Sequence, residues 1–114
     1  MRREGCDEEN LKPDDFICDF CRNTWTEDRQ MVEGHRGTLI CQHCLTAAYS
    51  KVIREGTGIS TPPMVVCTLC QAHHDTPHWQ GPGEGAPVAC KRCIEQSARI
   101  LEKDPDAGWK RPPA

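Results

Sequence analysis

Four C-x-x-C pairs make cysteine the residue type in this sequence that is best placed to do chemistry. Nineteen residues separate the two pairs in each half of the chain, and the second half repeats the first after 49 positions without a gap. Zn²⁺ binds four thiolates tetrahedrally, and two residues between paired cysteines allow one tight turn to aim both sulfurs at one metal. The spacing therefore predicts two zinc ions, one in each of two four-cysteine sites. The expected ligands are Cys18, Cys21, Cys41 and Cys44 for the first site and Cys67, Cys70, Cys90 and Cys93 for the second.

The cysteine pairs can be combined in two ways. In a sequential arrangement the first pair shares a metal with the second, whereas in a cross-brace it shares a metal with the third. Each half carries its own hairpin and helix pattern, and the halves are related by duplication. An ancestral single unit must have closed its own site, so we expect the sequential arrangement.

A disulfide framework is the main alternative for so many cysteines. The N-terminal stretch Met1–Asn10 contains no apolar run, so we expect neither a signal peptide nor a membrane anchor. No stretch approaches the ~20 apolar residues that a spanning helix needs. We therefore expect a cytoplasmic, reducing environment and no membrane partner. In that environment such pairs more often hold metal than form disulfides.

The chain has little material for a hydrophobic core. Only 37% of its 114 residues are hydrophobic and 5% are aromatic, and the repeat divides them between two small units. Units of about 35–45 residues usually need metal, disulfides or oligomerisation in order to fold. We therefore expect zinc binding to supply much of the folding free energy.

The elements around the cysteines follow one order in both halves. Residues 16–21 form a short strand that enters a zinc turn, and the glycines at 34 and 37 bracket the turn of a hairpin whose second strand, 38–40, leads into Cys41. A helix of about residues 42–55 is then predicted by apolar side chains at helical spacing. Those side chains are Leu45, Ala48, Tyr49, Val52 and Ile53.

Turn, hairpin and ligand-bearing helix together predict a treble clef. The fold class is thus a small, zinc-stabilised α+β structure of two treble-clef fingers in tandem. Its expected divisions are a disordered tail 1–15, finger 1 at 16–56, a linker 57–64, finger 2 at 65–104 and a disordered tail 105–114. In this interpretation Trp109 is an incidental residue of the second tail.

Several residues that bind metals in other proteins lie outside the two predicted sites. His73, His74 and His78 cluster between the cysteine pairs of the second half, and we expect them in a solvated loop because a four-thiolate site is already complete. Cys6 stands alone in the first tail, where we expect a free, exposed thiol.

Charge and motifs narrow the function classes. The net charge of −3 falls to about −7 once eight thiolates and two Zn²⁺ are counted, and negative charge repels phosphate backbones. No phosphate-cradling loop or nucleophile elbow occurs, and four-cysteine zinc sites are closed and structural. We therefore expect a non-enzymatic protein that does not bind nucleic acid.

The first half resembles a known family. Ile17–Cys21, Met31–Gly34 and Leu39–Leu45 are similar to the four-cysteine zinc-binding domain of the bacterial ClpX unfoldases, with an aromatic residue inside the first pair and an apolar pair before a glycine. In the second half Leu69 replaces that aromatic residue, Phe20. An ungapped alignment places Trp79 at Gln30, and Gln80-Gly81-Pro82 then breaks the apolar pair.

The resemblance implies a treble clef that dimerises and recruits adaptors and substrates for an ATP-driven protease. The 114 residues contain no ATPase module, so it implies a platform for protein binding and no unfolding activity. The tandem repeat predicts either an intrachain pseudo-dimer of the two fingers or a homodimer. The expected interaction residues are Phe20, Leu45, Ala48, Val52, Ile94, Ala98 and Leu101.

The leading hypothesis is thus a zinc-binding protein-interaction module, an adaptor or regulator related to Clp-type proteolysis. Two alternatives stay open. One is a nucleic-acid-binding zinc finger, for which the second helix supplies four basic residues. The other is a thiol redox or zinc-release switch, since C-x-x-C thiolates can oxidise and expel metal.

Overall fold

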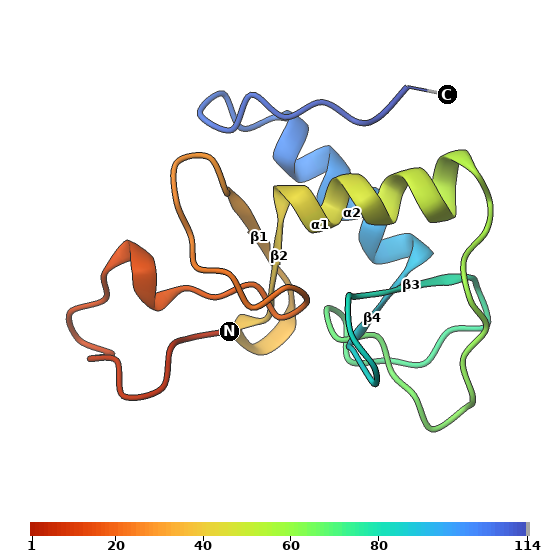
Figure 1. Ribbon diagram of the computed structural model, residues 1–114, viewed down its shortest axis with the longest axis horizontal. Helices are drawn as coiled ribbons and strands as arrows, with labels where there is room; N and C mark the ends of the chain where they lie inside the picture. The colour runs from red at the N-terminus through yellow and green to blue at the C-terminus, as the bar shows by residue number, and fades with distance from the viewer. Residues whose placement is uncertain (114) are drawn as a thin grey trace.

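Each half of the chain folds as a two-stranded hairpin followed by a helix (Figure 1). The computed structural model describes residues 1–113. In the first half β1 is Met31–Glu33, β2 is Leu39–Cys41, and α1 (Gln42–Ala48) continues into the π-helical turn η3 (Tyr49–Arg54). In the second half β3 is His78–Gln80, β4 is Val88–Cys90 and α2 is Lys91–Glu102. Short 3₁₀ turns η1 and η2 cover Pro13–Asp15 and His35–Gly37.

The registers of the two hairpins correct the ungapped alignment of the halves. Val32 pairs with Ile40 in the first hairpin, and Trp79 pairs with Ala89 in the second. Ile40 and Ala89 are 49 positions apart, but Val32 and Trp79 are only 47 apart. The second hairpin has two more residues in its turn and two fewer before its first strand. Trp79 is therefore the structural counterpart of Val32 and not of Gln30.

The same shift restores a pattern that the ungapped alignment had broken. Gly34 donates its N–H to Thr38 O, and Gly81 donates in the same way to Pro87 O. Gly81 is thus the counterpart of Gly34, and the stretch 78–81 corresponds to 31–34. His78 and Trp79 take the places of Met31 and Val32, so one apolar residue and the glycine are kept at a displacement of two residues, whereas the other apolar residue is replaced by histidine.

One hydrophobic core joins both fingers. It contains residues from both zinc turns, both hairpins and both helices, and α1 packs directly against α2. Leu45 of α1 and Ile94 of α2 are fully buried. Each such aliphatic side chain stabilises the fold by about 1.5–3 kcal/mol relative to an exposed one. All seven expected interaction residues, from Phe20 to Leu101, are buried in this shared core.

The segment after α2 is held against the fingers, which differs from the expected disordered tail (Figure 1). After α2 the chain turns back over α1, where the Trp109 side chain is 7% exposed and its Nε1–H donates to Thr46 Oγ1 at 2.9 Å. At the other end the first residue is tied to finger 1, because Ile17 N–H donates to Met1 O at 2.6 Å. The last residue of the predicted tail, Ala114, lies outside the described residues.

Trp109 is a single aromatic residue among prolines and carries no periodic signal, so its burial against the helix pair depends on tertiary packing alone.

Among residues 1–113, no helix is both long enough and apolar enough to cross a membrane.

Candidate metal centres

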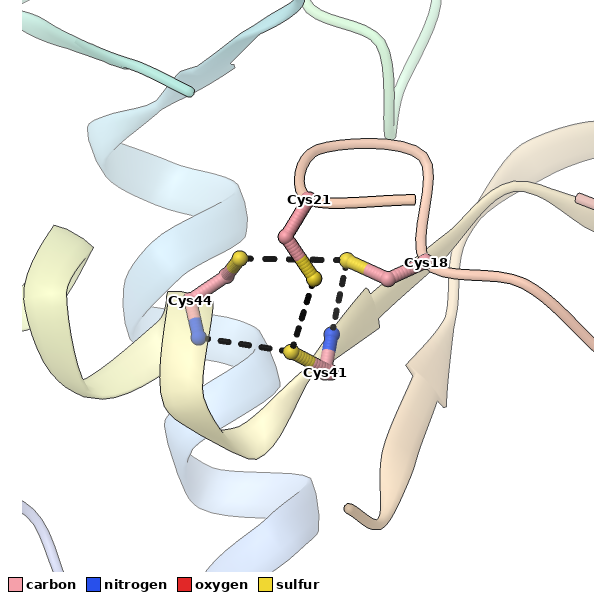
Figure 2. Close-up of side chains that lie close together, drawn as sticks. All are labelled: Cys18, Cys21, Cys41 and Cys44. Atoms are coloured by element: carbon pink, nitrogen blue, oxygen red, sulfur yellow. Dashed lines mark hydrogen bonds between the residues drawn. The ribbon is translucent and has the colours of Figure 1, made fainter. Parts of the chain in front are cut away.

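The first four cysteines converge on one point (Figure 2). Their Sγ atoms all lie within 4.8 Å of one another, with 3.8 Å between Cys18 and Cys44 and 3.7 Å between Cys21 and Cys41. A tetrahedral zinc with Zn–S bonds of about 2.3 Å places its sulfurs about 3.8 Å apart. The spacing of the four sulfurs is therefore that of a closed four-thiolate zinc site.

Two kinds of local structure position these sulfurs. A hydrogen bond from Arg22 N–H to Cys18 O, at 3.0 Å, closes the zinc turn. Arg22 itself lies in the left-handed region of backbone conformation, at φ 65°. Cys41 ends β2 and is the N-cap of α1, whose first turn carries Cys44. The positive end of the helix dipole therefore faces the thiolates, as the sequence predicts.

Main-chain N–H groups surround the sulfurs of site 1. Cys18 Sγ accepts from Phe20 N–H and from Cys41 N–H, each at 3.4 Å, and Cys41 Sγ accepts from Cys44 N–H at 3.4 Å. Hydrogen bonds of this kind disperse negative charge on a thiolate and orient the ligand. They arise from the turn and the helix start themselves, so the fold that brings the cysteines together also stabilises their ionised form.

Arg29 adds a positive charge to the first site. Its Nη1 lies 3.2 Å from Cys41 Sγ and 3.6 Å from Cys21 Sγ. Hydrogen bonding from Cys18 and Cys44, with a smaller contribution from Arg29, holds the pKa of Cys41 far below its usual range. Hydrogen bonding with Cys41 in turn raises the pKa of Cys18 to about 11. Nothing in the cysteine pattern singles out Arg29, because its approach depends on the turn before β1.

The second site has the same ligand geometry. Cys67, Cys70, Cys90 and Cys93 also place their Sγ atoms within 4.8 Å of one another. Gln71 N–H closes the zinc turn on Cys67 O at 2.8 Å, and Cys90 N–H donates to Cys67 Sγ at 3.3 Å. Both contacts have exact positional counterparts in the first site. The sequential arrangement of the cysteine pairs is thus confirmed, and the cross-brace is excluded.

The surroundings of the two sites differ. The second site has no arginine at its sulfurs among residues 1–113. Instead, His74 Nε2 lies 3.3 Å from Cys70 Sγ. The two metal centres therefore share their four thiolates and differ in the groups that touch those thiolates.

The sequence predicts that all three histidines lie in a solvated loop, but the structure buries one of them. His78 is fully buried in β3, and its Nδ1 lies 2.8 Å from Thr76 O. His73 is half-buried, with Nδ1 3.1 Å from Val65 O and Nε2 3.1 Å from Asp75 Oδ1. The order of this segment comes from its pairing with β4 and the linker, which the sequence pattern does not reveal. Cys6 belongs to neither cluster and is half-buried.

A comparison with known protein families identifies the type of zinc finger to which the first metal site is similar. Residues 16–54 match the ClpX C4-type zinc finger. This finger binds zinc through four cysteines, which agrees with the geometry of the first centre. The match covers about a third of the chain and leaves the second centre outside it. No curated protein and no solved structure matches the chain.

Proposed function

We propose that this chain is a zinc-built platform for protein interactions, in which two fingers pair within one chain. Its role is binding rather than catalysis, because each four-thiolate site is closed and leaves no position for a substrate. The proposed setting is the reducing cytoplasm, where the eight ligand thiols stay available to zinc.

The observation that carries the proposal is a reciprocal contact between the fingers. The hairpin of finger 1 meets the zinc turn of finger 2 at Leu69, whose carbonyl oxygen accepts from His35 N–H at 2.7 Å. The hairpin of finger 2 meets the zinc turn of finger 1 at Phe20, whose ring lies 5.5 Å from that of Trp79. Phe20 and Leu69 occupy equivalent positions in the repeat.

Equivalent elements thus meet in both directions, hairpin against zinc turn, as they do between two subunits of a dimer with an isologous interface. The ClpX-type resemblance implies pairing of single zinc domains. A tandem repeat achieves the same arrangement without a second chain, which supports an intrachain pseudo-dimer over a homodimer. The buried residues of the shared core are then unavailable to an outside partner, so a partner must use the remaining surface.

The proposed link to Clp-type proteolysis comes from the match of finger 1. In this proposal the chain binds a ClpX-type unfoldase, or a substrate of one, and changes which substrates are degraded. The second finger then diversifies the surface, because its hairpin carries the neutral, exposed Gln80 where finger 1 carries the charged, exposed Glu33.

The test uses a purified ClpX-type unfoldase with its peptidase and a tagged fluorescent substrate. Zinc-loaded full chain should bind the isolated zinc domain of the unfoldase in a calorimetric titration and should change the degradation rate at least twofold. A zinc-loaded four-cysteine protein of unrelated sequence serves as the control. Absence of both binding and any rate change, at chain concentrations well above that of the unfoldase, would refute the link to proteolysis.

A further inference from the structure

Two of the four ligands of the second metal centre are reached from a groove. The groove has a volume of about 500 Å³ and lies between β1 of finger 1 and the zinc turn and helix α2 of finger 2. Cys70 and Cys93 both line it, whereas none of the four ligands of the first site does. The Cys70 side chain is half-buried, so one thiolate of the second site has free space beside it.

His74 lines the same groove and lies beside Cys70. Its Nε2 is 3.3 Å from Cys70 Sγ, but it is not a member of the cluster of four sulfurs. The segment that carries it, residues 71–77, contains no helix or strand that would hold the side chain in place. The second centre therefore has a fifth donor atom next to one of its four ligands, on the side where there is room to move.

The imidazole of His74 is not committed to another contact. Among residues 1–113 its ring nitrogens form no hydrogen bond besides the one with Cys70. The neighbouring His73, by contrast, is held at Nδ1 by Val65 O and at Nε2 by Asp75. A permanent histidine ligand is normally oriented by a hydrogen bond at its second ring nitrogen. His74 lacks this support, so its resting position is that of a neighbour of the site and not of a fixed ligand.

The first site has no equivalent donor. Four residues after Cys21 the chain carries Trp25, whereas His74 lies four residues after Cys70. The indole N–H is a donor only and offers no lone pair to a metal. Arg29 Nη1, at 3.6 Å from Cys21 Sγ, is a donor of the same kind. The surroundings of site 1 stabilise its thiolates but cannot replace one of them.

We propose that His74 is a reserve zinc ligand of the second site, which takes the position of Cys70 when that thiolate is lost or modified. The site then changes from four thiolates to three thiolates and one imidazole, which is a common structural zinc site. Zinc bound through Nε2 leaves the ring proton on Nδ1, and no partner within the described part of the chain opposes this tautomer. The exchange also removes one negative charge from the site. The inference does not depend on the proposed function.

A small electrophile that enters through the groove, such as a maleimide, brings about this exchange. The electron pair of the Cys70 thiolate forms a bond to one alkene carbon, and the neighbouring carbon takes a proton from water and leaves hydroxide. The zinc–sulfur bond is given up and is replaced by a bond to His74 Nε2. Finger 2 therefore keeps its zinc while it carries a modified cysteine. The same modification of Cys21 leaves finger 1 with three ligands, and its zinc is released.

Variants of the full chain, folded with a small excess of Zn²⁺, test the exchange. Cys70→Ser should keep two zincs in native mass spectrometry, whereas Cys21→Ser should keep one. Adding His74→Ala to Cys70→Ser should lower the zinc affinity of the second site at least tenfold further. Adding His73→Ala instead is the matched control and should leave the second zinc in place. Loss of a zinc by Cys70→Ser, as by Cys21→Ser, would overturn the proposal.

The same variants distinguish a reserve ligand from a residue that only supports Cys70. If His74 acts only through its hydrogen bond to Cys70, His74→Ala should weaken the second site while Cys70 is present and should have no effect once Cys70 is serine. The proposal expects the opposite order, with an effect of His74→Ala that is at least tenfold larger in the Cys70→Ser background. An equal or smaller effect in that background would contradict it.

Spectroscopy identifies the fourth ligand directly. With Co²⁺ in place of zinc, the absorption bands of Cys70→Ser should show one four-thiolate site and one site of three thiolates and a nitrogen. In the zinc form, long-range ¹H–¹⁵N spectra should show the Nε2 signal of His74 moved to the position of a metal-bound nitrogen. An unchanged Nε2 signal, with serine or water as the fourth ligand, would refute the role of His74.

Labelling tests the modification of Cys70 in a chain that carries Cys6→Ser. One equivalent of N-ethylmaleimide should label Cys70 first, as located by peptide mapping, and native mass spectrometry should still count two zincs. In the same chain with His74→Ala, the Cys70 adduct should retain only one. Retention of the same number of zincs in both chains, or labelling of Cys21 in preference to Cys70, would count decisively against the proposal.

Discussion

Gly34 lies directly against the carbonyl oxygen of Leu69, so that a Cβ built on Gly34 would stand 2.6 Å from that oxygen. The same oxygen accepts the N–H of His35. The hairpin of finger 1 therefore covers the zinc turn of finger 2 at main-chain distance, where no side chain fits. On the other side of the pair Pro82 takes the place of His35 and has no N–H to donate, so the two contacts are related but unequal.

Replacing Gly34 by alanine should separate the fingers locally. Its backbone at φ −103° is acceptable for any residue, so the cost comes from the forced contact with Leu69 and not from backbone strain. Overpacking of this kind costs about 1–3 kcal/mol. Urea denaturation at fixed free zinc should show that loss in the free energy of unfolding.

Gly81→Ala is the matched control, because a Cβ there would lie 3.2 Å from Phe20 O and needs only a small adjustment. Gly34→Ala should therefore cost more than Gly81→Ala. Equal effects, or a stabilisation by Gly34→Ala, would show that the two fingers do not meet as closely as described.

Replacing Cys41 by serine should remove one zinc and destabilise both fingers. Cys41 is fully buried and supplies one of the four thiolates of site 1, and the folding of small zinc units depends on metal binding. Because the core is shared, the loss should lower the melting temperature of finger 2 as well. Native mass spectrometry should count one zinc instead of two. Cys6→Ser, which changes a cysteine outside both clusters, should keep two zincs, and retention of two zincs by Cys41→Ser would refute the ligand assignment.

Replacing Arg29 by alanine should weaken site 1 selectively. Its Nη1 lies 3.2 Å from Cys41 Sγ, and loss of such an outer partner typically lowers metal affinity about 10–100-fold. Competition with a graded chelator measures the affinity, and alkylation of freed cysteines followed by peptide mapping identifies the site that released zinc. Lys51→Ala, a charge removed from an exposed position, should leave both sites unchanged. Release first from Cys67 to Cys93 in Arg29→Ala would contradict the assignment.

The metal sites could be predicted from the sequence because neighbouring residues in the chain position each cysteine pair. A turn of two residues and a helix start place each cysteine pair, and the repeat supplies the sequential combination. The helix of finger 1 was also predictable, since its apolar side chains recur at helical spacing, although the structure divides it into α1 and the π-helical turn η3.

Features that depend on pairing between distant segments could not be predicted in this way. The displacement of Trp79 relative to Val32 results from compensating changes in loop length, which an ungapped repeat conceals. The burial of His78 depends on β4 and on the linker residue Ile59, 19 positions earlier in the sequence. The docking of Trp109 depends on contact with the shared core and on a hydrogen bond to Thr46, a residue far from it in the sequence.

Replacing Trp109 by alanine should therefore destabilise the whole fold. The indole is 7% exposed, lies in the shared core and donates to Thr46, whereas a disordered tail would contribute nothing. Truncation of a buried tryptophan costs about 3–5 kcal/mol, and we expect the lower end of this range because the neighbouring tail can relax. Urea denaturation at fixed free zinc measures the change, with Trp25→Ala, at a half-buried position, as the control. An unchanged midpoint in Trp109→Ala would return residues 105–113 to the disordered tail that the sequence predicts.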